Sequence, residues 1–124
     1  MRKITTHRVG KINEAIGISV HGDEPGVFGA YTDYEIYINQ GDHPQKYAAL
    51  KFPDALSTKG TPVIGITNES LLAIIIDRLE GFCGSEHPPY EYGEALRNCR
   101  QAMHWLHFRT QNRIDRKVDG TTKP

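Results

Sequence analysis

The hydrophobic period of the chain changes once, near Thr67, and this change constrains the fold more than any other sequence feature. Before this point, apolar residues alternate with small or polar ones over residues 15–20, 34–38 and 47–52. Such alternation is typical of strands that bury one face. We therefore predict a small antiparallel β-meander over about residues 14–53.

Turn-forming residues separate the predicted strands. Gly, Pro, Asp and Asn gather at residues 22–29 and again at 39–44, which predicts two breaks in the meander. Both breaks are too short to hold a crossover helix. A further stretch rich in Pro, Gly, Ser and Thr, at residues 53–65, is interpreted as the linker to a helical half.

Two helices are predicted after this linker. Thr67 stands where an N-cap residue is favoured, and the helix behind it is apolar around most of its circumference, which predicts burial on more than one side. Pro88 and Pro89 suit the first turn of a second helix, which we expect to end near Lys117. Residues 67–117 are thus predicted to form a long antiparallel helical hairpin.

The length and composition exclude several classes of protein. With 124 residues, a single domain over residues 1–124 of the α+β class is expected. Fifteen Lys and Arg balance fifteen Asp and Glu, so the total charge favours neither nucleic acid nor an anionic membrane as a partner.

The longest apolar run, residues 71–76, is too short to span a membrane. The first eight residues lack the apolar stretch of a secretory signal, and we expect a cytoplasmic protein whose Cys83 and Cys99 are reduced.

The two predicted helices differ greatly in length. At the rise of an α-helix the first measures roughly 22 Å and the second roughly 43 Å. In an antiparallel hairpin, the first helix would extend alongside the second only as far as about Met103. Residues 104–117 would then have no helical partner. This overhang carries Trp105 and Phe108 among basic residues, and exposed aromatic side chains there favour association. We expect a second copy of the chain, or the sheet, to cover it.

Basic residues concentrate in the second helix. Between Arg97 and Lys117 there are six Lys and Arg and one acid, Asp115. Arginine predominates, which favours bidentate contacts to phosphate or carboxylate. The alternative is a solvated helix face whose cations complement the helix dipole. A nucleic-acid-binding helix is a further hypothesis, with a steep dependence of affinity on salt as its signature.

One stripe of this helix is predicted to pack on the first helix. Its apolar members recur in steps of four and three, which is the spacing of a helix–helix seam. In the same register the stripe reaches two arginines. The residues of the stripe, in order, are Ala95, Cys99, Ala102, Leu106, Arg109 and Arg113.

The sequence offers no persuasive catalytic or metal-binding set. His104 and His107 are three residues apart and lack a third ligand at a suitable spacing. His21 and His43 each have acidic neighbours but lie in turn-like segments, which disfavours a role in acid–base chemistry. We expect no enzyme, no cofactor and no metal ion.

The helical half resembles a phage protein family. The likeness lies in residues 65–79 (GITNESLLAIIIDRL), 101–113 (QAMHWLHFRTQNR) and 118–121 (VDGT), and residues 23–52 are similar in order and spacing. The family is Thoeris anti-defence protein one, whose hairpin is shared with anti-CBASS protein two.

This resemblance implies a sponge, meaning a protein that binds a signal molecule and holds it without cleaving it. Members of the family bind cyclic ADP-ribose isomers that bacterial TIR-domain enzymes make during infection, in the host cytoplasm. Some members also hold cyclic oligonucleotides at separate sites, in assemblies from dimers to hexamers. Glycocyclic ADP-ribose is therefore the implied ligand, and cyclic di- or trinucleotides of CBASS immunity are the alternative, as the main or a second ligand. No membrane or nucleic-acid partner is expected.

The resemblance also implies a ligand site. Carried over by position, Phe82 would stack on adenine, and Arg109 and Arg113 would bind the pyrophosphate. Tyr92 stands where many relatives carry a small polar side chain, but it retains the ability to stack or to donate a hydrogen bond. Because the overhang does not close the hairpin core, we expect either arginine to be replaceable by alanine without loss of the fold.

Helix geometry constrains how these residues can meet. Phe82 lies beside the predicted hairpin turn, whereas Arg109 is about 25 Å beyond Tyr92 along the second helix. A single site would need Phe82 from one subunit and the arginines from another. We therefore predict a homodimer with two equivalent pockets at the subunit interface.

Overall fold

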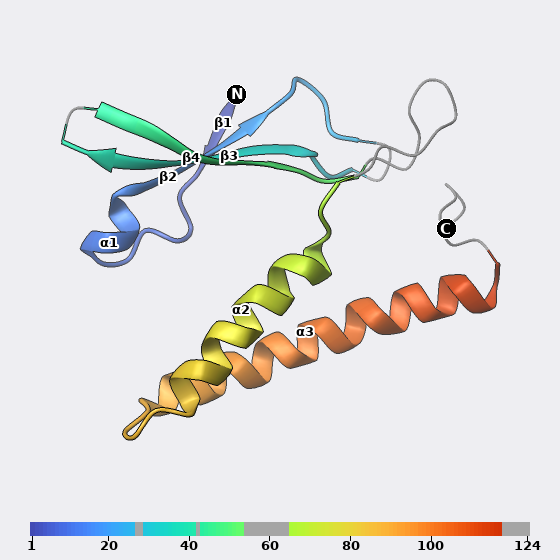
Figure 1. The fold of residues 1–124 in the computed structure, drawn as a ribbon. Coiled ribbons are helices and arrows are strands. Elements are labelled where there is room, and N and C mark those ends of the chain that lie inside the picture. The colour runs from blue at the N-terminus through green and yellow to red at the C-terminus, as the bar shows by residue number, and fades with distance from the viewer. Residues whose placement is uncertain (27–28, 42, 54–64, 118–124) are drawn as a thin grey trace. The chain divides into compact units, whose positions relative to one another are not determined.

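The computed structural model describes residues 1–26, 29–41, 43–53 and 65–117 (Figure 1). Most of the predicted linker and the 118–121 stretch lie outside the described residues. The contacts divide the chain into two units, Met1–Ile66 and Thr67–Pro124, so the boundary falls at the predicted change of hydrophobic period. The single domain expected for the whole chain stays a prediction.

The first unit is a four-stranded antiparallel sheet in the order β1-β2-β3-β4, which confirms the predicted meander. Two of its elements were not predicted, the strand β1 and the single-turn helix α1, because each is too short to display a period. The elements are β1 (Arg2–Ile4), α1 (Lys11–Glu14), β2 (Ile16–His21), β3 (Asp33–Gln40) and β4 (His43–Lys51).

The predicted break at residues 39–44 is wrong in its extent. β3 continues to Gln40 and β4 begins at His43, with Asn39 paired to Pro44. Gly41 makes the tight turn possible because its φ of 63° lies in the left-handed region, which glycine adopts without a steric penalty. Pro44 is tolerated because β4 is an edge strand, where a missing N–H need not interrupt the ladder.

One face of the sheet is apolar. The predicted alternation places Ile18 and Val20 of β2 opposite Ile36 and Tyr34 of β3, and Val20 is only 1% exposed. Tyr34 meets Phe52 edge to face, with ring centroids 5.5 Å apart. This face forms the core of the first unit.

The opposite face carries a polar cluster around Glu35. The Tyr37 hydroxyl donates to its carboxylate, the Lys46 ammonium lies 3.2 Å away, and His21 Nε2 lies 3.4 Å away. The bond from Tyr37 has the largest effect and lowers the pKa of Glu35; burial acts in the opposite direction, and Lys46 and His21 lower the pKa further by smaller amounts. Predicting His21 as a turn residue was therefore wrong, since it ends β2 and faces a carboxylate across the strands.

Acidification should lower the free energy of unfolding of the first unit through the protonation of Glu35. A carboxyl whose pKa is lowered by folding stabilises the fold above its ordinary pKa of 4.5, and the contribution is lost as the pH falls through the lower folded value. The Glu35→Gln variant should therefore have a lower free energy of unfolding than the wild-type protein at neutral pH. On acidification, this free energy should fall less in the variant than in the wild type. Free energies of hydrogen exchange for β2 and β3 amides, from about pH 7 to about pH 3, measure this. Glu14→Gln, at an exposed carboxyl of α1, is the control; equal pH profiles for both variants would contradict the assignment.

The second unit is the predicted helical hairpin, made of α2 (Asn68–Cys83) and α3 (Tyr90–Asp115). Thr67 is confirmed as the N-cap of α2. Its hydroxyl accepts from the Ser70 N–H at 3.1 Å, and the Ser70 hydroxyl accepts from the Thr67 N–H at 3.0 Å. This reciprocal pair satisfies two backbone donors that the first turn leaves unpaired.

Thr67→Ala should lower the free energy of unfolding of the hairpin by about 1 kcal/mol, because a first-turn N–H loses its acceptor. Helical circular dichroism during urea unfolding measures the loss. Thr110→Ala is a matched control, since Thr110 is exposed within α3 and alanine favours a helix interior there. A loss of the same size in both variants would argue against the cap.

The seam of α3 keeps four residues of the predicted stripe, which are buried or half-buried, and adds Leu96 and Met103; the four are Ala95, Cys99, Leu106 and Arg113. The buried Leu96 lies in line with the half-buried Cys99, Met103 and Leu106, whereas Ala102 is exposed. Turning Met103 inward in place of Ala102 buries more apolar surface. Leu71, Leu72, Ile76 and Leu79 of α2 are half-buried, while Ile74 and Ile75 are exposed, so the burial of α2 on more than one side is not found within the single chain.

α3 extends beyond α2, as predicted (Figure 1). Since Phe82 faces Tyr92, the equal rise of the two helices puts the first residue of α2 opposite about Leu106. Residues 107–112 are all exposed, so the unpartnered segment begins about three residues later than expected. Trp105 and Phe108 are 66% and 59% exposed, which leaves a large aromatic surface uncovered in the single chain.

Candidate functional site

Two of the predicted ligand-binding residues come together at the tip of the hairpin. Phe82, in the last turn of α2, and Tyr92, in the first turn of α3, stack with ring centroids 5.0 Å apart and planes 23° apart. Their side chains remain 40% and 39% exposed. The sequence placed both near the turn but did not predict that they would touch.

An arginine that sequence reasoning missed completes this group. Arg78 lies one turn before Phe82 on α2, and its guanidinium carbon is 5.4 Å from the centre of the Phe82 ring. We call Arg78, Phe82 and Tyr92 the tip cluster. The available signal was the spacing of four residues between Arg78 and Phe82, which puts both on one face of a helix.

The predicted arginine pair lies at the other end of α3. Arg109 is exposed, whereas Arg113 is buried, at 8% exposure. Tyr92 and Arg109 belong to one uninterrupted helix and are separated by about 25 Å along its axis. Within one chain, therefore, the structure does not bring Phe82 and Arg109 together.

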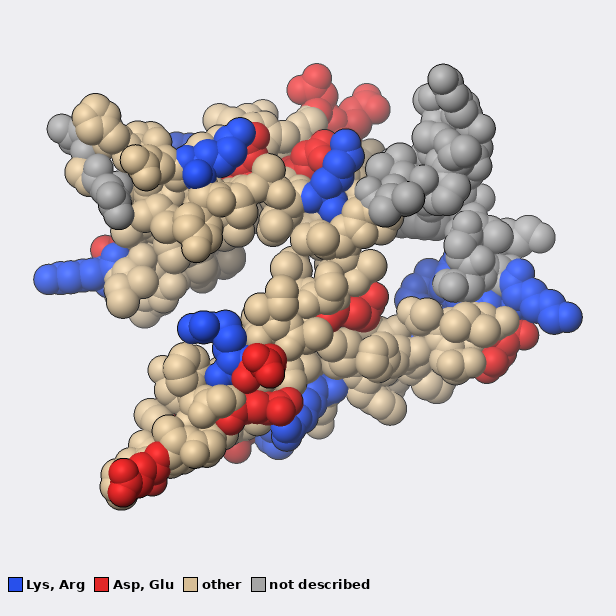
Figure 2. All heavy atoms as spheres, viewed as in Figure 1, with Lys and Arg blue, Asp and Glu red and all other residues tan. Residues whose placement is uncertain are grey.

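The basic residues of α3 are not one uniform cationic stripe. Arg97 donates to Glu94 at 2.7 Å, which raises the pKa of its guanidinium, and Arg100 lies 3.5 Å from Glu80 of α2. Basic side chains do gather at the C-terminal end of α3 (Figure 2). Nearer the tip, the ion pairs of Arg97 and Arg100 neutralise part of the positive charge of α3. This weakens the hypothesis of a nucleic-acid-binding helix, which would use all the basic residues between Arg97 and Lys117.

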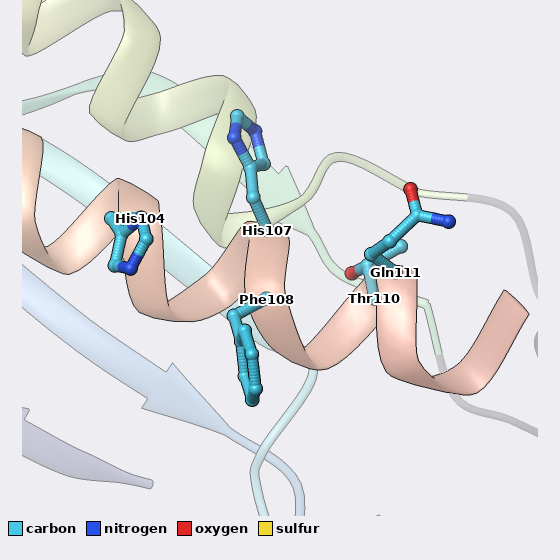
Figure 3. Close-up of a pocket in the computed structure, with 5 residues that line it drawn as sticks. All are labelled: His104, His107, Phe108, Thr110 and Gln111. Atoms are coloured by element: carbon cyan, nitrogen blue, oxygen red, sulfur yellow. The ribbon is translucent and has the colours of Figure 1, made fainter. Parts of the chain in front are cut away.

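A shallow hollow lies on the overhang of α3, with His104, His107 and Phe108 among its lining residues. The side chains project from a single helix (Figure 3), and no other described element lines the hollow. In the described part of the chain, no group of three or more His, Cys, Asp or Glu is placed to hold a metal ion. Cys83 and Cys99 are free thiols, as expected.

The chain is similar to a known phage protein. The chain is 33% identical over 97 residues to Thoeris anti-defense 1 of Bacillus phage SBSphiJ7, an alignment that covers 72% of this chain and 68% of the relative. No family model matches the sequence. Over the described ranges, none of the helices has both the length and the apolar character that crossing a membrane requires.

The likeness therefore defines a phage anti-defence protein, directed against the Thoeris system. The chain belongs to the Thoeris anti-defence 1 family, which confirms the resemblance found in its sequence.

The burial of Arg113 changes one expectation from the sequence. Both arginines were expected to be replaceable without loss of the fold, but only Arg109 is exposed. Arg113→Ala should lower the free energy of unfolding of the hairpin by about 1 to 3 kcal/mol, because it removes a buried charged group from its contacts. Arg109→Ala should change it by less than about 0.5 kcal/mol. Urea unfolding followed by helical circular dichroism compares the two, and equal stability would show that Arg113 does not support the hairpin.

Proposed function

We propose that this protein is a sponge for cyclic ADP-ribose isomers, with glycocyclic ADP-ribose as the ligand. It would hold this signal without cleaving it in the cytoplasm of the infected bacterium, and so block Thoeris immunity. Membership of the Thoeris anti-defence 1 family is the observation that carries the proposal. The exposed tip cluster supports it, because exposed aromatic rings can stack on a purine base.

The separation of the candidate residues favours a pocket built from two subunits. About 25 Å of helix lies between Tyr92 and Arg109, which a compact cyclic dinucleotide cannot bridge. In an antiparallel dimer, the overhang of one α3 would bring Arg109 to the tip cluster of the partner. Burial of Trp105 and Phe108 would favour the same arrangement.

Contact energies favour a pocket with more than one bond from each of the three residues carried over from the family. A base stack contributes about 1 to 3 kcal/mol, and a charge-assisted hydrogen bond about 1.5 to 3 kcal/mol. One stack and a single hydrogen bond from each of the two arginines thus fall short of the roughly 12 kcal/mol that nanomolar binding requires. Tyr92, stacked beside Phe82, is a candidate for a further contact.

The test is calorimetric titration of the purified protein with glycocyclic ADP-ribose, followed by chromatography of the recovered ligand. We expect tight binding and unchanged ligand, since a sponge has no chemical step. Absence of heat at micromolar protein would refute binding, and an altered ligand would show an enzyme. Titration with cyclic trinucleotides, alone and in competition, tests the alternative ligand class.

The shared pocket predicts complementation between two inactive variants. Phe82→Ala and Arg109→Ala homodimers should each bind poorly, because every pocket lacks one of its residues. After subunit exchange, each mixed dimer holds one intact pocket and one doubly altered pocket, so about a quarter of all pockets should bind. Calorimetric stoichiometry measures this fraction. The double variant mixed with Arg109→Ala cannot form an intact pocket and is the control; no recovery in the test mixture would place the site within one subunit.

A further inference from the structure

We propose that Arg78 is an additional ligand-binding residue, which contacts the nucleotide whose base stacks on Phe82. This inference rests on the proposed function and names a residue that the family resemblance did not supply. Its basis is the position of the guanidinium over the Phe82 ring, 5.4 Å from the ring centre. The Arg78 side chain is exposed, as is that of Phe82.

Arg78 differs from the other arginines near the tip in its partners. Arg97 and Arg100 are held by Glu94 and Glu80. Among the described residues, by contrast, no carboxylate lies within ion-pair distance of Arg78, and its recorded contact is the Phe82 ring. A guanidinium held by one exposed ring is weakly restrained, because water screens such a contact. Arg78 can therefore be redirected without breaking an ion pair.

A stacking base must compete for the Phe82 ring. Tyr92 already lies nearly parallel to that ring and comes from the opposite helix, so displacing it would break a contact that joins α2 to α3. Displacing Arg78 moves only one exposed side chain on α2. The incoming base is therefore expected to take the place of the guanidinium on the ring.

The displaced guanidinium remains anchored one helical turn from Phe82. It is planar and carries five N–H donors, so it can stack on the outer face of a base and donate to a phosphate oxygen. A cyclic ADP-ribose isomer offers both groups within one compact ring. Arg78 thus exchanges a contact with Phe82 for contacts with the ligand, which makes it a direct participant in binding.

The chain offers a matched pair of variants for the test. Arg78→Met keeps the aliphatic stem and removes the guanidinium, and Arg97→Met makes the same change at an exposed arginine paired with Glu94. We expect Arg78→Met to raise the dissociation constant for glycocyclic ADP-ribose about tenfold, in line with the loss of a charge-assisted contact. Arg97→Met should change it less than about twofold. Helical content and the thermal midpoint, followed by circular dichroism, should be the same in both variants.

A double-mutant cycle then tests whether Arg78 acts on the base at Phe82. In a Phe82→Leu background, the effect of Arg78→Met should fall to less than about threefold, because the stacked base that the two residues share is gone. An unchanged or tighter dissociation constant in Arg78→Met alone would overturn the inference, as would fully additive effects in the cycle. Failure of the wild-type protein to bind would instead refute the proposed function, so the two failures are distinguishable.

Discussion

The unequal length of the two hairpin helices is the constraint on which the rest of the second unit depends. α2 has 16 residues and α3 has 26, so antiparallel packing leaves the end of α3 without a partner from its own chain. Phe108 lies on that end, and Trp105, just before it, is also exposed, so α2 leaves the apolar surface of both side chains uncovered. The mismatch thus leaves about 25 Å of helix between Tyr92 near the turn and Arg109 on the longer helix.

The hairpin also distributes its charges unevenly. Near the tip, Arg97 and Arg100 are held by carboxylates, while Arg78 lies over an aromatic ring. Toward the C-terminal end of α3, Arg113 is buried and Arg109 is exposed. These five arginines therefore differ in how firmly they are held, because an ion pair fixes a guanidinium and a solvated ring contact leaves it available.

Hydrophobic periodicity was sufficient to predict the meander, both long helices and the overhang, and the N-cap preference of Thr predicted the cap at Thr67. It failed where single contacts decide the outcome. β1 is three residues long, and the turn at Gly41 depends on one positive φ angle. The choice of Leu96 and Met103 over Ala102 as seam residues depends on side-chain volume. The stacking of Phe82 on Tyr92 arises from the packing of α2 on α3, which spacing along the chain does not encode. The contact of Arg78 with Phe82 and the burial of Arg113 agree with helical spacing, but spacing alone does not show which exposed or seam positions make contacts.

The edge strand β4 has features that affect whether another strand can pair with it. Pro44 deprives the outer edge of a donor, and the shift of register between Ile36 and Tyr37 interrupts the ladder beside it. Lys46 and Lys51 add charge along the same strand. Edges with such features are poor templates for strand addition by foreign chains. Strand addition along the β4 edge of the sheet is therefore disfavoured.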